Sequence, residues 1–353
     1  KDPAMYRIST HIRRSAAALG AAALMAATGC SNDEAVESNQ TSSTNPANSD
    51  STTDSTTATT ATIVDAAGDV DWTTLPSTDV TLSDDGLAIT DAGTYVLTGS
   101  STGQVTVNAA GAVRIVLDGV NIESTAGAAI QVDQADLTVI ELADDSDNSI
   151  SDAATRRDED IDAAIYSSDD LVLTGNGMLN VTANFADGIV GQGDLAITSG
   201  TYALTTVDDG IRGTDSLTID GGTIDIVESV EGIEAPVIVI DDGDITINAS
   251  DDGINASASD IITTGLSITI NGGRITIVMA SGDTDAIDSN GDLTITGGTI
   301  DITAQSAFDF DGTGTLTGGT ITVNGESVTE LTNQMMGGGG MGGGRPGGDP
   351  VGR

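Results

Sequence analysis

The chain has 353 residues, a formal net charge of −43 and only 2% aromatic residues. A charge this negative excludes electrostatic binding to nucleic acid or to an anionic membrane surface, and it makes cations the expected partners. The chain also has a single cysteine, which excludes a disulfide framework.

The N-terminal segment has the features of an export signal. Residues 1–4 precede Met5 and are interpreted as a remnant of cloning. Residues 5–29 contain a basic start, an apolar run too short to span a bilayer, and small residues before Cys30. The letters AATGC resemble a bacterial lipobox, so Cys30 is the predicted lipidation site; an ordinary signal beside a coincidental cysteine is the alternative. The expected location is extracellular, with a lipid anchor as the only contact with the membrane of the bacterial cell envelope.

Composition divides the rest of the chain into three parts. Residues 30–62 consist mostly of Ser, Thr, Asn, Asp and Ala, so they are predicted to form a disordered tether. Residues 333–353 are rich in glycine and are predicted to form a flexible tail. Residues 63–332 lie between them and are long enough for one large domain.

Residues 63–332 contain an internal repeat. An acid, a small residue and an isoleucine recur at intervals of 21 or 22 residues, with one longer interval of 33. The aligned isoleucines are Ile189, Ile211, Ile233, Ile254 and Ile287. Each unit also has two alternating strands joined by a glycine turn, as in SLTIDGGTIDI at 216–226. This pattern predicts an all-β fold, a parallel β-helix of about 21–22 residues per rung with alternate apolar side chains inside. A β-sandwich of hairpins is the alternative, and the fixed period argues against it.

Carboxylates form a column in this repeat. The residues two positions before the aligned isoleucines are all acidic, and Asp208 and Asp251 double two of the rungs. Unit charges about 5 Å apart repel by about 3 kcal/mol at an effective dielectric near 20, and no lysine or histidine follows Cys30 to offset this repulsion. A bound cation would offset it. The candidate metal ligands are Asp187, Asp208, Asp209, Glu231, Asp251, Asp252 and Asp285, with Asp283 as a loop ligand.

Calcium is the predicted cofactor. It takes six to eight oxygen ligands at about 2.3–2.6 Å, so one ion can bridge rungs about 4.8 Å apart, whereas magnesium requires a tighter octahedron. Turn chemistry with solvated acids is the alternative, but it does not explain an acid on every aligned rung. The glycines are expected to provide positive φ or a close approach of the next rung. The loops at 143–162, 256–265 and 278–286 are expected to form the walls of a groove around the metals.

Several stretches resemble a known family. The letters GTYVLTGSSTGQVTVNA, VRIVLDGVNI and AAIYSSDDLVLTGNG, followed by stacked DGI and GGTIDI units, are similar to secreted bacterial carbohydrate-binding β-helix proteins over residues 75–330. The resemblance implies a right-handed parallel β-helix, related in shape to calcium-dependent pectate lyases. It also implies lipoproteins that bind calcium and acidic or plant-type polysaccharides without cleaving them. Ser168 departs from the family, which usually has lysine at this step.

The same residues bear on catalysis. A polysaccharide lyase needs a base, and the absence of lysine after Cys30 excludes a lysine-dependent lyase. Arg212 adjoins the acid column and, with Asn255, is a candidate ligand-binding residue; an ion pair with a neighbouring aspartate is its alternative role. Trp72 is the single tryptophan and precedes the repeats, so aromatic stacking is expected to contribute little. We therefore expect a non-catalytic protein that binds acidic, pectin-like polysaccharide through calcium.

Three other functions are considered. A calcium-stabilised structural or adhesive spacer and a calcium-dependent polysaccharide lyase are both compatible with the sequence. Ice binding requires a flat column of threonines, and Asp244 and Arg274 interrupt the column that follows the glycine turns.

Overall fold

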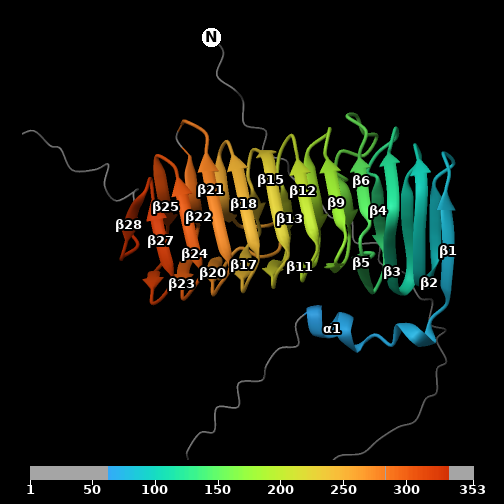
Figure 1. Ribbon diagram of the computed structural model, residues 1–353, viewed down its shortest axis with the longest axis horizontal. Coiled ribbons are helices and arrows are strands. Elements are labelled where there is room, and N and C mark those ends of the chain that lie inside the picture. Colours follow the sequence, from blue (N-terminus) through green and yellow to red (C-terminus); the bar gives the residue numbers. More distant parts are fainter. Residues whose placement is uncertain (1–62, 283, 334–353) are drawn as a thin grey trace, which may run out of the picture. The chain divides into compact units, whose positions relative to one another are not determined.

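The computed structural model describes residues 63–282 and 284–333. The expectations for Cys30, Asp283 and the segments 1–62 and 334–353 lie outside the described residues. Within the described part, 28 strands form the successive turns, or rungs, of a solenoid, and every strand pair except the last is parallel (Figure 1). None of its helices is long and apolar enough to cross a membrane.

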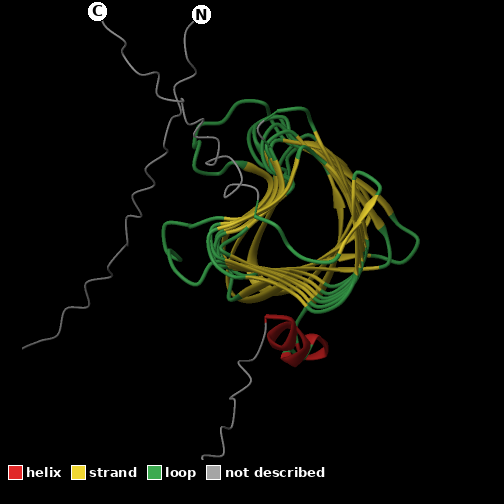
Figure 2. Cartoon of the chain, turned by 90° about the vertical axis from the view of Figure 1, so that its left-hand side faces the viewer, coloured by secondary structure: helices red, strands yellow, loops and turns green. Residues whose placement is uncertain are grey.

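The strands lie on three faces (Figure 2). The first rungs are formed by β1 (Ser77–Leu82), β2 (Leu87–Ser101) and β3 (Val105–Glu123). The first face continues with β4 (Ile130–Gln134), β7 (Ala163–Ser167), β10 (Asp187–Gly191), β13 (Ile211–Gly213), β16 (Ile233–Glu234), β19 (Asp252–Ala256), β22 (Asp285–Ser289) and β25 (Ser306–Phe310). The second face continues with β5 (Leu137–Leu142), β8 (Leu171–Gly175), β11 (Asp194–Ile197), β14 (Ser216–Ile219), β17 (Val237–Ile240), β20 (Ser267–Ile270), β23 (Asp292–Ile295) and β26 (Gly314–Leu316). The third face continues with β6 (Asp147–Ser151), β9 (Met178–Thr182), β12 (Thr201–Thr205), β15 (Thr223–Ser229), β18 (Asp244–Ala249), β21 (Arg274–Met279), β24 (Thr299–Thr303) and β27 (Thr320–Val323), to which β28 (Glu326–Val328) adds antiparallel.

The aligned isoleucines are direct neighbours on the first face. Ile189 pairs with Ile211, Ile211 with Ile233, Ile233 with Ile254, and Ile254 with Ile287. All these pairs are parallel and connect consecutive rungs. The prediction of a parallel β-helix is therefore confirmed, and a sandwich of hairpins is excluded because its neighbouring strands would be antiparallel.

The core follows the alternation in each strand. In β15, Ile224 and Ile226 are fully buried, whereas Thr223 and Asp225 are exposed. Equivalent aliphatic residues from the other rungs stack into one continuous core. Burying each such side chain contributes about 1.5–3 kcal/mol, and this core holds together a chain whose net charge opposes compactness.

Two kinds of glycine shape the rungs. In the glycine turns the backbone has positive φ, for example 94° at Gly222, which favours glycine. In the acid-Gly-Ile motifs glycine is needed because the next rung leaves no room for a side chain. A Cβ on Gly210 would lie 2.5 Å from the carbonyl oxygen of Gly232, and a Cβ on Gly232 would lie 2.4 Å from the carbonyl oxygen of Gly253. Close approach of the next rung therefore accounts for the acid-Gly-Ile motif.

A short helical segment precedes the first rung and was not predicted. Helix α1 (Ile63–Asp69) is followed by the 3-10 helix η1 (Trp72–Thr74). Ile63 packs in one apolar cluster with Val172 and Ala196, which point outward from the second face. Helix α1 therefore covers an apolar part of the outer surface of the solenoid (Figures 1 and 2).

Candidate functional site

The acidic residues come together where the chain turns into the first face. The amide of Gly188 donates to the carbonyl of Asp209, that of Gly210 to Glu231, and that of Gly232 to Asp252, each at 2.9 Å. These bonds place the acids of successive rungs one above another, and Asp252 pairs directly with Asp285. We call this stack the acid corner. Its first column is made of the acids before the aligned core residues: Asp187, Asp208, Asp209, Glu231, Asp251, Asp252 and Asp285. Its second column is made of the residues directly after the aligned isoleucine or phenylalanine on β13, β16, β19, β22 and β25: Arg212, Glu234, Asn255, Asp288 and Asp309.

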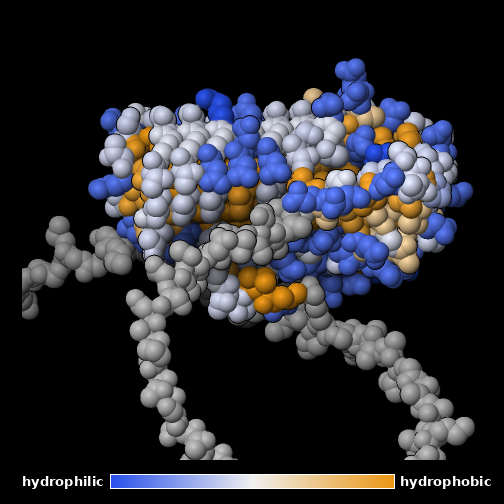
Figure 3. Space-filling model, turned by 90° about the horizontal axis from the view of Figure 1, so that it is seen from below, coloured by the Kyte–Doolittle hydropathy of each residue, from blue (hydrophilic) through white to orange (hydrophobic). Residues whose placement is uncertain are grey.

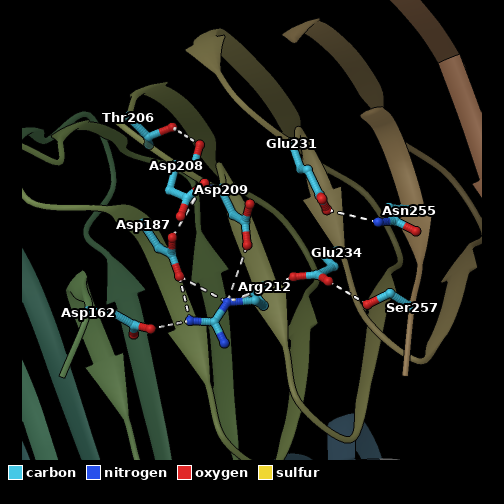
Figure 4. A network of polar contacts seen from close by, with 10 residues as sticks. All are labelled: Asp162, Asp187, Thr206, Asp208, Asp209, Arg212, Glu231, Glu234, Asn255 and Ser257. Carbon is cyan, nitrogen blue, oxygen red and sulfur yellow. Dashed lines mark hydrogen bonds and ion pairs between the residues drawn. The ribbon is translucent and has the colours of Figure 1, made fainter. Parts of the chain in front are cut away.

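Arg212 lies inside one half of the acid corner (Figure 4). Its Nε donates to Oδ2 of Asp187 at 2.9 Å, and its Nη2 donates to the same oxygen at 2.5 Å and to Oδ2 of Asp162 at 2.6 Å. Its Nε also lies 3.3 Å from Asp209 and 4.0 Å from Glu234. The ion pair considered in the sequence analysis is thus present, but with several partners, and only 22% of the arginine side chain is exposed.

Burial and crowding shift the ionisation of this half. Burial raises the pKa of Asp187 to about 7, although the Arg212 guanidinium opposes the shift. The pKa of Glu231 is raised to about 8, first by burial and then by Glu234. Burial alone would lower the pKa of Arg212, but Asp187, Asp162 and Asp209 together raise it. The arginine therefore stays charged, and its single charge does not balance the carboxylates around it.

In the other half of the acid corner, the charged neighbours that shift the pKa values of Asp252 and Asp288 are all acidic. Burial raises the pKa of Asp252 to about 6, and the charged neighbours that add to this shift are Asp251, Asp285 and Asp309. Burial likewise raises the pKa of Asp288 to about 7, with further contributions from aspartates alone. Near neutral pH Asp288 therefore holds its proton for about half of the time, and Asp252 gains one just below neutral pH, unless a cation replaces the proton.

Asn255 connects the two halves. It pairs with Glu234 on one side and with Asp288 on the other. Its Nδ2 donates to Oε2 of Glu231 at 3.0 Å, while its Oδ1 is buried and accepts no hydrogen bond from the described residues (Figure 4). A buried amide oxygen without a donor is uncommon in folded proteins and indicates a missing partner.

The donor set suits a hard divalent cation. Asp209, Glu231 and Glu234 each offer a carboxylate oxygen, and these oxygens lie within 4.8 Å of one another. Carboxylate and amide oxygens are the ligands that calcium prefers, and the free oxygen of Asn255 adds a neutral one. Asp187 fits less well as a ligand because Arg212 already binds its Oδ2. The residues present therefore fit calcium, with the centre of the site nearer Glu231 than Asp187.

Two of the long loops reach the acid corner. The stretch 143–162 was expected to be one loop, but Asp147–Ser151 form β6, and the part that follows β6 supplies Asp162. In the loop that follows β19, the Ser257 hydroxyl donates to Glu234. Arg156 anchors the first loop: it pairs with the buried Asp152, and its guanidinium carbon lies 4.9 Å from the centroid of the Phe185 ring. These contacts fix the loop ends beside the acids.

Asp162, Glu234, Asp288 and Asp309 were not among the predicted metal ligands. The last three have a signal in the sequence, because they occupy the position directly after the aligned core residue, as Arg212 and Asn255 do. A second column at that position could have been identified from the repeat alone. Asp162 lies in a loop outside the period, so the repeat does not indicate it.

The chain is similar to proteins described as carbohydrate-binding and to one described as polysaccharide lyase-like. A family model described as a carbohydrate-binding domain-containing protein matches residues 83–327 of the chain. A carbohydrate-binding domain-containing protein of Acetivibrio thermocellus is 40% identical over 129 residues, which are 34% of this chain and 45% of that relative, so the match spans less than half of the relative's length. The solved structure of the polysaccharide lyase-like protein from C. thermocellum, a gadolinium derivative, is similar with 29% identity and a TM-score of 0.47, over 70% of this chain and 94% of that chain.

Proposed function

The chain belongs to the family of carbohydrate-binding domain-containing proteins, and from this we propose that its acid corner binds an acidic, pectin-like polysaccharide with the help of calcium. The observation that carries the proposal is the buried Oδ1 of Asn255, which accepts no hydrogen bond from the described residues and lies beside more carboxylates than Arg212 alone can balance. Asp209, Glu231, Glu234 and Asn255 would hold the ion. Bound calcium would supply the positive charge that both the corner and a uronate carboxylate need.

The other contacts of the acid corner support a cation near Glu231 and Glu234. Arg212 compensates Asp187 and Asp162, which leaves Glu231 and Glu234 for a cation. No arginine is among the charged neighbours that shift the pKa of Asp288, so this residue and the aspartates around it offer a second place for a cation on the same surface. A linear polymer of uronates could contact both places, since they follow one another along the solenoid.

Binding without cleavage is part of the proposal. A lyase would need an arginine base here, and a base must release its proton near neutral pH. The carboxylates around Arg212 raise its pKa and keep it protonated. Arg156 has a lowered pKa, but only 2% of its side chain is exposed, so a polymer does not reach it.

We also propose that the protein is held at the bacterial cell surface by a lipid on Cys30. The proposal depends on the lipobox-like letters AATGC alone. Replacing Cys30 with alanine should release the protein into the medium. A Cys30→Ala protein that remains in the membrane fraction would contradict the anchor.

A panel of soluble glycans, tested by affinity electrophoresis with calcium and with EDTA, examines the proposed function. Polygalacturonate should retard the protein in calcium and not in EDTA, and no unsaturated products absorbing in the ultraviolet should form. Binding to no glycan, with calcium still raising the melting temperature, would instead favour a calcium-stabilised spacer.

A further inference from the structure

The single tryptophan of the chain lies beside an open hollow on the outer surface. The hollow has a volume of about 570 Å³, and the residues that line it include Asp69, Asp71, Trp72, Ser77, Thr94 and Arg114. A volume of this size falls within the range of small-molecule sites. Figure 3 views this side of the molecule, on which apolar residues gather in patches between hydrophilic ones.

Trp72 is held firmly in the hollow. Asp71 caps η1, because its Oδ1 accepts from the amide of Thr73 at 3.1 Å and from the Thr73 hydroxyl at 2.6 Å. The half-buried indole packs against the apolar cluster that contains Val139 and Val172. Because the backbone of Trp72 is capped and its indole is already packed, little conformational entropy is lost when a ligand contacts the ring.

Arg114 lies over the indole ring and is also fixed. Its guanidinium carbon lies 5.3 Å from the centroid of the Trp72 ring. Its Nε donates to the hydroxyl of Thr94 at 3.3 Å, and its Nη1 lies 3.3 Å from Glu141. About a third of both charged side chains remains exposed, with 29% for the arginine and 35% for the glutamate.

The charges around the hollow decide the class of ligand. Glu141 already balances Arg114, while Asp69 and Asp71 add two exposed acids with no second cation among the lining residues. A uronate or another anion would therefore be repelled. A neutral sugar meets no such cost: its C–H groups can contact the exposed part of the indole, and its hydroxyls can donate to the carboxylates and accept from the guanidinium.

We propose that the Trp72–Arg114 hollow is a second, calcium-independent subsite for a neutral pyranose unit of a polysaccharide. It rests on the carbohydrate-binding part of the proposed function and not on calcium or the acid corner. The chain would then combine two recognition chemistries: carboxylates with a cation on the first face, and an aromatic ring with charged hydrogen-bonding groups near its N-terminal rungs.

The single tryptophan makes the subsite directly observable. The full chain in EDTA is titrated with neutral hexasaccharides of glucose, mannose and xylose while Trp72 fluorescence is followed. At least one sugar should change the emission saturably. Arg114→Gln and Asp69→Asn, the latter at an exposed position, should each weaken binding about tenfold, the effect of losing one charged hydrogen bond. Arg274→Gln, an exposed arginine on β21, should leave binding unchanged.

The outcomes separate this subsite from the acid corner. An Asn255→Leu variant should keep the fluorescence response and lose calcium-dependent binding to polygalacturonate. If polygalacturonate never binds but a neutral sugar does, the calcium proposal is wrong and the subsite stands. No response to any neutral sugar, or an equal response to galacturonate oligomers in EDTA, would overturn the subsite.

Discussion

Arg212 and Asp187 lie on adjacent rungs and are joined through one oxygen: both Nε and Nη2 of the arginine donate to Oδ2 of the aspartate, at 2.9 and 2.5 Å. The aspartate side chain is only 3% exposed. Its other oxygen, Oδ1, accepts from the amide of Asp209 at 3.1 Å. The pair therefore stabilises the start of the acid corner and leaves the following rungs to be neutralised by something else.

The Arg212→Ala variant should unfold at clearly lower urea concentration than the wild type. Removing one partner of a buried ion pair leaves an uncompensated charge, which lowers the free energy of unfolding by about 3–5 kcal/mol. We expect about 3 kcal/mol, because 22% of the Arg212 side chain is exposed. Arg274→Ala, at an exposed position on β21, should change the free energy of unfolding by less than about 0.5 kcal/mol. Equal stability of the two variants would show that Arg212 is not a structural counter-charge.

Gly210→Ala should destabilise the fold through overpacking. Its Cβ would lie 2.5 Å from the carbonyl oxygen of Gly232 and 2.9 Å from Cδ1 of Ile226. Forced shifts of this kind cost about 1–3 kcal/mol. Gly68→Ala is the matched control, because a Cβ there meets nothing within 4 Å. Thermal melts should show a drop for the first variant and none for the second; two unchanged melts would refute the role of close approach.

Stability without calcium should fall as the pH rises from 5 to 8. The pKa of Glu231 is about 8 in the folded chain and about 4.3 in an unfolded one. Between these values the folded state holds a proton that the unfolded state has lost, so raising the pH favours unfolding. Asp252 and Asp288, with pKa values of about 6 and about 7, act in the same direction.

Melting in EDTA measures this dependence. We expect the melting temperature to fall by roughly 10 °C across this pH range, because the proton on Glu231 alone corresponds to about 4 kcal/mol between pH 5 and 8. Calcium should reduce the fall, and Glu231→Gln should flatten it. A melting temperature that stays constant or rises toward pH 8 in EDTA would contradict the assignment of raised pKa values.

Asn255→Asp should have opposite effects with and without calcium. A carboxylate between Glu234 and Asp288 adds repulsion when no cation is bound, so the variant should melt earlier in EDTA. With calcium it adds a charged ligand, which raises affinity. Calorimetric calcium titration should give tighter binding than the wild type, whereas Asn248→Asp on β18 should not. Weaker calcium binding by Asn255→Asp would place the ion elsewhere.

The repeat period in the sequence predicted those parts of the structure in which equivalent residues of successive rungs lie next to one another. The alignment of Ile189 with Ile211 and Ile233 predicted the parallel register, and the positions of Asp209 and Glu231 relative to these isoleucines predicted their stacking. A solenoid converts equal spacing along the chain into contact between rungs, so such columns can be read directly.

Features outside the period could not be predicted in the same way. The contact between Asp162 and Arg212 joins residues 50 positions apart, one of them in an irregular loop. Helix α1 is only seven residues long and is stabilised by packing on Val172 and Ala196 rather than by a helical pattern of its own. Trp72 precedes the repeats, and only the fold places it beside Arg114.

The most direct test of the account is calorimetric titration of the full chain with polygalacturonate oligomers, in calcium and in EDTA, beside a Glu231→Gln, Glu234→Gln double variant. The wild type should bind in calcium, lose at least about tenfold in affinity in EDTA, and release no cleavage products. The double variant should fold and fail to bind in calcium, because neutral amides replace the two carboxylates that would hold the ion near Asn255. Binding of equal strength in EDTA, or undiminished binding by the double variant, would contradict a calcium-dependent site at the acid corner.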